Sequence, residues 1–201
     1  MMMVTRNSVR VTQQKLSSRK VRQVAEKVAE VGALSGVEVT AGRLVSVVSE
    51  DRTSVFGFAS GIAGSSGNNF AGAGSLAINV INVETTAGIH GSETVINAGG
   101  VDVRAVNEGL VAGAAGSVGI TSGAAGGGLA VISNTIANTA AASISAAKIN
   151  TKYVTAVGAR SAASFFTFAG TLGGSAQVAL AGSVVNNNAI NNVSASIKDG
   201  A

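Results

Sequence analysis

The chain contains no cysteine, no proline and no tryptophan, and it has a single histidine among its 201 residues. Without cysteine it can form no disulfide, no thiolate nucleophile and no zinc–thiolate site. The lone His90 cannot join a second histidine in a catalytic or metal-binding group. Because it follows the last residue of a repeated phrase, we predict that His90 is a turn residue and not a catalyst.

Charged residues make up 12% of the chain and aromatic residues only 3%, whereas there are 27 glycines. A compact globular core normally uses more aromatic bulk, and a disordered chain would be richer in charge and poorer in valine and isoleucine. The remaining residues are mainly small or β-branched, which suit the pleated surface of a sheet. The composition therefore favours thin strands stacked in register.

A phrase of asparagine, isoleucine or valine and then small residues occurs three times, and each copy closes on Ala-x-Ile. The closing residues are Ile89, Ile144 and Ile197, which are 55 and then 53 positions apart. A glycine-rich patch precedes every copy, and "LVSVV" from Leu44 fits a degenerate first copy. Self-similarity at a long, fixed period indicates a repeat architecture. With roughly 20 residues to a coil of a parallel β-solenoid, each unit is predicted to form two to three coils.

The first 36 residues differ from the rest. Residues 1–36 hold seven Lys or Arg against two Glu, whereas residues 37–201 hold seven basic against eight acidic residues. Valines at helical spacing predict an amphipathic helix from about Gln13 to Val31. This helix would cap the first coil of the repeats. A basic arm for nucleic acid, an organelle presequence and a poorly ordered segment foreign to the repeats are the alternatives; we expect no nucleic-acid partner, because no aromatic residues interleave with the charges.

No catalytic, cofactor-binding or metal-binding residue is predicted. Glu50 and Asp51 are adjacent, so on a strand they would point to opposite faces, and a solvated turn is the expected structure. "GAGSLA" from Gly72 imitates part of a dinucleotide fingerprint, but a strand-like phrase follows it where that motif requires a helix. Residues 109–133 carry no charge and have small-xxx-small spacings. They allow a second interpretation, a glycine-rich membrane-associated protein.

Three stretches carry a resemblance to a known family: "SLAINVINVETTAGI" at 75–89, "GLAVISNTIANTAAASI" at 128–144 and "VALAGSVVNNNAINNVSASI" at 178–197. Their order resembles the repeats of large bacterial filamentous adhesins, the filamentous-haemagglutinin-like and leukotoxin-like passengers of type V secretion systems. The resemblance covers roughly residues 37–201. It implies a right-handed parallel β-helix, export across two membranes, and a role as a stalk or adhesive surface without catalytic residues.

We therefore expect an all-β protein, a right-handed parallel β-helix over residues 37–201 with a short N-terminal helix. The expected function is that of a structural or adhesive segment of a secreted or cell-surface protein. Its partners would be a glycan or protein receptor and a continuation of the same β-helix at the C-terminal edge. No secretory signal is visible, so the chain is expected to be an internal piece of a larger protein. A polysaccharide-acting enzyme on a β-helix scaffold is the alternative, and its candidate residues would be Arg104, Glu108, Lys148, Lys152 and Arg160.

Overall fold

A computed structural model describes residues 2–10, 33–67 and 70–198. All regular structure in these ranges is β, and no helix occurs in them. The strands are β1 (Met2–Arg10), β2 (Ala33–Ser35), β3 (Glu38–Ser65), β4 (Phe70–His90), β5 (Val95–Thr121), β6 (Ala125–Ser145), β7 (Lys148–Thr151), β8 (Thr155–Gly174) and β9 (Val178–Lys198). The prediction of an all-β protein is confirmed.

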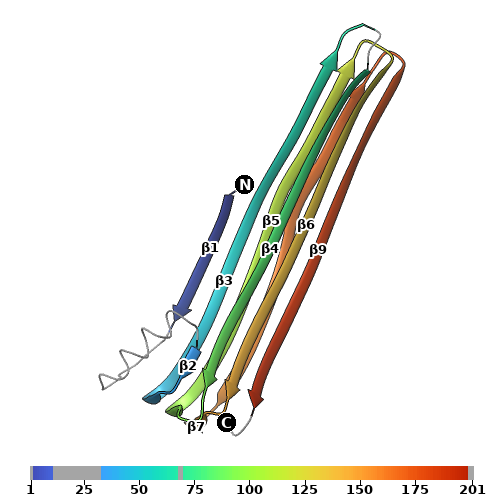
Figure 1. Ribbon diagram of the computed structural model, residues 1–201. Coiled ribbons are helices and arrows are strands. Elements are labelled where there is room, and N and C mark those ends of the chain that lie inside the picture. Colours follow the sequence, from blue (N-terminus) through green and yellow to red (C-terminus); the bar gives the residue numbers. More distant parts are fainter. Residues whose placement is uncertain (1, 11–32, 68–69, 199–201) are drawn as a thin grey trace.

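The strands form two sheets that face each other along a narrow shaft (Figure 1). The first sheet has the order β1-β3-β5, and β5 then pairs with both β7 and β8. The second has the order β2-β4-β6-β9. Apart from the antiparallel β1, neighbouring strands within each sheet are parallel. The chain runs along one sheet, turns at the end of the shaft and returns along the other.

Each repeat contributes one long strand to each sheet. Ile89 of β4 pairs with Ile144 of β6, and Ile144 pairs with Ile197 of β9, as the repeated phrase predicts. The estimate of two to three coils per unit is wrong, because the six long strands β3, β4, β5, β6, β8 and β9 run for 20 to 28 residues, so that one unit passes once along each sheet. No proline interrupts them. Near the base the register of β3 against β5 shifts between Ala41 and Leu44.

The Glu50–Asp51 pair was predicted to form a solvated turn, but the structure places it within a strand. Both residues lie inside β3 and point to opposite faces. Asp51 is buried and accepts a hydrogen bond of 2.7 Å from the Thr53 hydroxyl, whereas Glu50 lies outside beside Arg52. The predicted turn is therefore wrong, although the predicted opposition of the two side chains is correct. The Asp51 carboxylate can be buried inside the strand because the nearby Thr53 hydroxyl donates a hydrogen bond to it.

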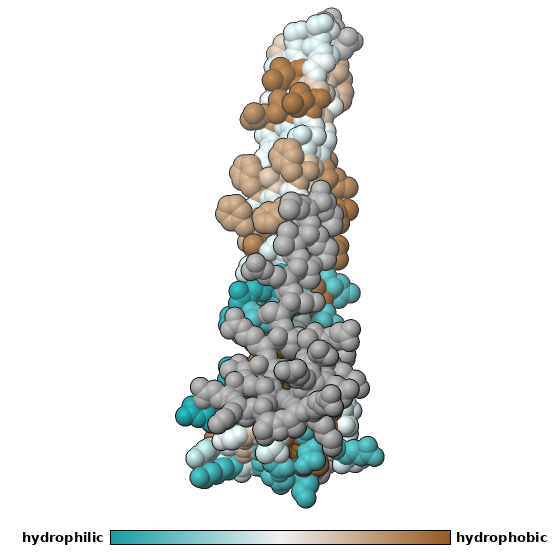
Figure 2. Space-filling model, turned by 90° about the vertical axis from the view of Figure 1, so that its left-hand side faces the viewer, coloured by the Kyte–Doolittle hydropathy of each residue, from teal (hydrophilic) through white to brown (hydrophobic). Residues whose placement is uncertain are grey.

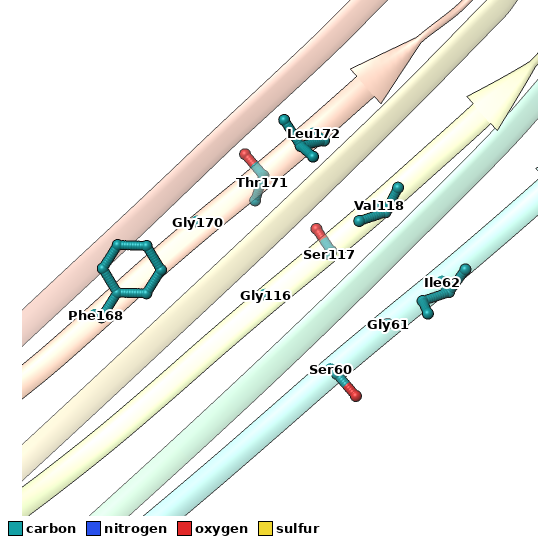
Figure 3. A pocket seen from close by; sticks show the side chains of 10 residues that line it. All are labelled: Ser60, Gly61, Ile62, Gly116, Ser117, Val118, Phe168, Gly170, Thr171 and Leu172. Carbon is teal, nitrogen blue, oxygen red and sulfur yellow. The ribbon is translucent and has the colours of Figure 1, made fainter.

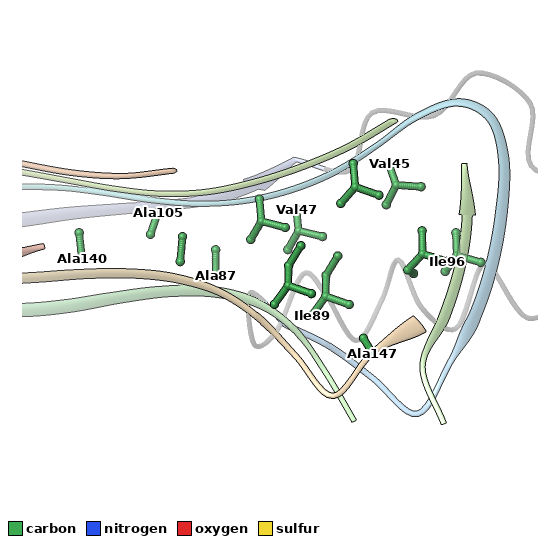
Figure 4. Close-up of a cluster of buried hydrophobic side chains, with 13 residues drawn as sticks. Val45, Val47, Ala87, Ile89, Ile96, Ala105, Ala140 and Ala147 are labelled. Carbon is green, nitrogen blue, oxygen red and sulfur yellow. The ribbon is translucent and has the colours of Figure 1, made fainter. Parts of the chain in front are cut away.

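The core lies between the sheets and changes along the shaft. At the base, where the ends of β4 and β6 lie, valines and isoleucines such as Val47, Ile89, Ile96 and Ile144 form the largest cluster (Figure 4). A second cluster contains Val55, Val111, Ile81 and Ile136. Toward the other end the cluster consists mainly of alanines. The sheets approach closely there, since a Cβ placed on Gly119 would collide with the backbone of Gly127.

The two ends of the stack differ in how they are covered. Residues Met2–Arg10 pair antiparallel with residues 48–56 of β3, and Ala33–Ser35 pair with the end of β4. The predicted helix from Gln13 to Val31 lies outside the described residues. At the other end, within the described residues, β9 pairs only with β6 and β8 only with β5. Ile197 is consequently 52% exposed, whereas Ile89 and Ile144 are fully buried. Its predicted burial is wrong, because no described strand pairs with the second edge of β9.

Residues 109–133 form the end of β5, the turn and the start of β6. They do not form the transmembrane helix that their composition allowed. In the ranges that the structure describes, no helix is long and apolar enough to cross a membrane. The small-xxx-small spacings instead place glycines where the two sheets pack closely, as at Gly113 and Gly119.

The exposure difference between equivalent isoleucines leads to a prediction. Ile144→Ala should lower the free energy of unfolding by about 2–5 kcal/mol, because it leaves a cavity between two strands of its own sheet and the facing sheet. Ile197→Ala, at the same column of β9, should have a clearly smaller effect. Urea unfolding of dilute protein followed by circular dichroism measures both, and equal losses would contradict the described position of β9 at the edge.

Candidate functional site

A chain of asparagine side chains, buried on β4 and β6 and exposed on the edge strand β9, crosses the second sheet. The Asn79 amide nitrogen donates to the Asn134 amide oxygen at 2.8 Å, and the Asn134 nitrogen donates to the Asn187 oxygen at 2.7 Å. Asn187 in turn donates to the Thr167 hydroxyl of the facing sheet at 3.2 Å. Asn79 and Asn134 are 2% and 0% exposed. Because each amide offers both a donor and an acceptor, an in-register column can continue from strand to strand.

Glycines in the facing sheet make room for this asparagine ladder. A Cβ on Gly57 would collide with the Asn79 side chain, and a Cβ on Gly113 would lie 3.2 Å from the Asn79 nitrogen. Glycines on β3 and β5 therefore lie opposite the asparagines on β4 and β6. An amide is too wide for the narrow gap unless the residue opposite has no side chain.

Two further asparagines tie the sheets together directly. The Asn107 amide of β5 donates to the Val83 carbonyl at 3.1 Å, and the Asn138 amide of β6 donates to the Ala162 carbonyl at 3.3 Å. Asn107 and Asn138 are 0% and 1% exposed, and neither amide oxygen has a hydrogen-bond partner among the described residues. These contacts fix the position of one sheet relative to the other along the strand direction, since a shift in that direction would break both bonds.

The candidate residues of the polysaccharide alternative are divided between two places. Arg104, Glu108 and Arg160 lie on neighbouring strands at the outer face of the first sheet, where Arg160 is in register with Val106. The Glu108 carboxylate pairs with Arg52 at 3.2 Å, and Arg104 pairs with Asp102 at 2.8 Å. These arginine side chains are more than half exposed, so the pairs are solvated.

The other two candidates, Lys148 and Lys152, lie at the base. Lys148 begins β7, and the Lys152 ammonium lies 5.4 Å from the centre of the Tyr153 ring. They are separated from Arg104 and Glu108 along the shaft, because β7 pairs with the first residues of β5. Within the described ranges, no group of three or more acidic or histidine side chains is close enough to hold a metal ion.

His90 is the last residue of β4, next to the turn at Gly91, whose φ of 97° favours glycine. Its Nδ1 lies 2.8 Å from the Ser145 hydroxyl of the adjacent strand. The ring covers Gly88 of its own strand, where a Cβ would collide with it. The prediction that His90 is a turn residue is wrong, because His90 is the last residue of β4 and the turn follows it. The "GAGSLA" stretch likewise lies within β4, which is not the strand-to-helix turn of a dinucleotide site.

Sequence reasoning missed a feature on the outer face of the first sheet, which is formed by exposed or partly exposed residues in register on three strands. Its floor is the run of small residues Ala112, Ala114 and Gly116 on β5. Its walls are phenylalanines of the two flanking strands, in register with the floor: Phe56 and Phe58 on β3, Phe166 and Phe168 on β8. We refer to this feature as the phenylalanine trough.

The phenylalanine trough continues into a shallow depression of about 450 Å³. Figure 3 shows its lining, which comes from three parallel strands: Ser60, Gly61 and Ile62; Gly116, Ser117 and Val118; Phe168, Gly170, Thr171 and Leu172. None of these residues is charged. The signal in the sequence was the pair of phrases "FGF" at 56–58 and "FTF" at 166–168, because alternate residues of a strand share a face.

Comparison of the chain with family models, with curated proteins and with solved structures gives no match.

The asparagine ladder leads to a prediction about stability. Asn134→Ala removes both hydrogen bonds of the middle amide and leaves the buried Asn79 donor without its partner, which should cost about 1–3 kcal/mol or more of unfolding free energy. Asn150→Ala is the matched control, because Asn150 donates to Asn97 at 2.8 Å in an exposed pair where water can replace the bond. Chemical unfolding measures both, and a loss at Asn150 as large as that at Asn134 would contradict a special role for the buried ladder.

Proposed function

We propose that this chain is a structural segment of an exported bacterial surface protein, a right-handed parallel β-helix that acts as a stalk or an adhesive surface. The observation that carries the proposal is the repetition of inward columns across three strands of one sheet. Asn79, Asn134 and Asn187 share one column, and Ile89, Ile144 and Ile197 share another. Such a stack can be extended, because each added repeat makes the same contacts as the previous one.

The dimensions suit a stalk. A strand of 21 residues at about 3.3 Å per residue is roughly 70 Å long, and the shaft is only two sheets thick. Hydrogen bonds along every strand and side-chain amides between strands make such a body stiff in both directions of the sheet. The resemblance to filamentous adhesin repeats supports export and surface location.

The outer face of the second sheet offers a repetitive polar surface toward the base. Its outward residues are mostly hydroxyl and amide side chains, on strands about 4.8 Å apart: Thr86, Thr135, Thr139, Ser143, Asn188, Asn192 and Ser194. Regularly spaced donors and acceptors with little charge suit a glycan or a protein surface as receptor. We propose this face as the adhesive surface.

The C-terminal edge is the proposed site of continuation. β9 presents 21 residues whose outer N–H and C=O groups have no partner among the described residues, and Lys198 is its only charged residue. A long edge strand with so little charge is a template for another strand. The next β-helix unit, or another copy of this chain, would pair there.

The continuation is tested by a single inward charge on β9. Val193 lies in the inward column of Ala140, and it is 51% exposed because β9 is at the edge. Val193→Lys should leave the monomer folded but block strand addition, since pairing would bury an unpartnered ammonium group. Asn192→Lys, which adds the same charge on the outward face, is the control.

Sedimentation velocity over a concentration series measures the effect. We expect species joined edge to edge for the unchanged chain and for Asn192→Lys, and their loss for Val193→Lys. Equal association of all three would show that the β9 edge is not the site of continuation.

A further inference from the structure

Among the residues that the structure describes, charge is confined to one half of the shaft. Residues 53–83, 109–147 and 161–197 contain no Asp, Glu, Lys or Arg. The first two of these uncharged segments begin at the same level of the shaft. Arg52, just before the first segment, is in register with Glu108, just before the second. Figure 2 shows the result, an apolar upper half above a hydrophilic base.

The phenylalanine trough lies in this uncharged half and is strongly exposed. Phe56, Phe58, Phe166 and Phe168 are 51%, 78%, 78% and 67% exposed. At roughly 200 Å² for each residue, the four rings alone present about 500 Å² of apolar surface. The exposed residues Ile62, Ile120 and Leu172 on the same face extend this toward the roughly 800 Å² that each partner contributes to a standard interface.

The trough does not suit a small ligand. It is open along its whole outer side, whereas ligand pockets enclose most of the molecule that they bind. Its walls and floor offer no charged group, and the hydroxyl residues that line its depression are Ser60, Ser117 and Thr171. An extended apolar surface is the occupant that this chemistry fits.

Lipid is a poorer occupant than protein. Immersing this half of the shaft in hydrocarbon would place the unpaired edges of β8 and β9 there, and each unsatisfied backbone group costs several kcal/mol in lipid. In contrast, a protein surface laid on the outer face of the first sheet covers the rings and leaves both edges in water.

The face is complementary to itself. The phenylalanine walls stand one strand away from the floor of small residues, so a shift of one strand spacing, about 4.8 Å, places a wall over a floor. We propose that two copies of this chain pack through the outer faces of their first sheets. Phe166 and Phe168 of each copy then lie over Ala112 and Ala114 of the other, between its two walls.

This arrangement has a defined symmetry. A twofold axis parallel to the strands, between β5 and β8, exchanges wall and floor in both copies, as an isologous interface requires. The shafts run in the same direction, and the four sheets stack about 10 Å apart. The interface uses a face of the sheet, so it is independent of strand addition at the β9 edge, and either association can exist without the other.

Sedimentation equilibrium tests the interface. All variants carry Val193→Lys, which removes edge pairing if it occurs. We expect a dimer, and we expect Phe166→Ser/Phe168→Ser to raise its dissociation constant at least about tenfold. Leu76→Ser/Val184→Ser is the control, since it removes two exposed apolar side chains from the opposite outer face and should leave the dimer unchanged.

A second variant addresses the floor. Ala114→Leu fills the trough without removing any ring, and it should weaken the dimer as the ring variant does. Circular dichroism checks that each variant keeps its β-structure. A chain that is monomeric with the trough intact, or a dimer that tolerates both trough variants, would overturn the proposal.

Spin labels distinguish the two modes of association. Because the chain has no cysteine, Ser133→Cys places a single label on the outer face of the second sheet. Copies packed face to face put these labels about 30 Å apart, three sheet spacings, whereas copies joined edge to edge put them about 14 Å apart, three strand spacings. Pulsed and continuous-wave EPR measure these distances.

The same proteins are mixed with phosphatidylcholine vesicles and floated on a density gradient. The proposal expects the chain to remain with the soluble fraction as a dimer. Flotation that depends on Phe166 and Phe168, with no dimer in solution, would identify lipid as the occupant and overturn the proposal. Failure of the edge pairing alone would leave the face-to-face dimer intact.

Discussion

Strand register is the constraint on which the rest of the structure depends, and the asparagine ladder is the interaction that enforces it. A slip by one residue would turn the inward column outward. For Asn134 such a slip would break two amide hydrogen bonds and would carry Ile136 and Ile132 out of the core. Flat sheets of small residues are otherwise weakly specified in register. Polar side chains that must find each other inside an apolar core set the alignment at a cost in stability, as a buried asparagine does in a coiled coil.

The ladder also affects the distance between the two sheets at its own level of the shaft. Amides in one sheet need glycines in the other, so Gly57 and Gly113 stand opposite Asn79. Beyond them the sheets come closer still, until glycine faces glycine backbone at Gly119 and Gly127. At the base, the larger cluster around Ile89 and Ile144 holds the sheets further apart. The shaft is therefore stabilised mainly by apolar burial at its base and by close backbone packing toward its other end.

Much of this could be predicted from the sequence, because a repeat brings equivalent residues together. The alignment of Ile89, Ile144 and Ile197 follows from their spacing, as does the all-β structure. The strand length could not be predicted, since nothing in the composition distinguishes short strands with corners from one long strand. The exposure of Ile197 depends on what lies beyond β9, which its own sequence does not encode. The phenylalanine trough depends on the register of β3, β5 and β8. The phrases "FGF" and "FTF" could therefore not be placed on the same face of one sheet before that register was known.

The distribution of charge links the fold to assembly. Ion pairs such as Arg52–Glu108 lie across neighbouring strands at the boundary of the base, where they favour water and oppose aggregation of the lower faces. Above them the strands carry no charge to blunt an edge or a face, and natural sheets normally place charges at such positions. A chain that protects one half and leaves the other uncovered is organised for contact along the uncovered half. The edge of β9 provides backbone groups for strand addition, whereas the phenylalanine trough provides apolar side chains for packing, so the two surfaces use different interactions at right angles to each other. If both proposed associations occur, strand addition at β9 and packing through the phenylalanine trough would together build a fibre thicker than a single shaft.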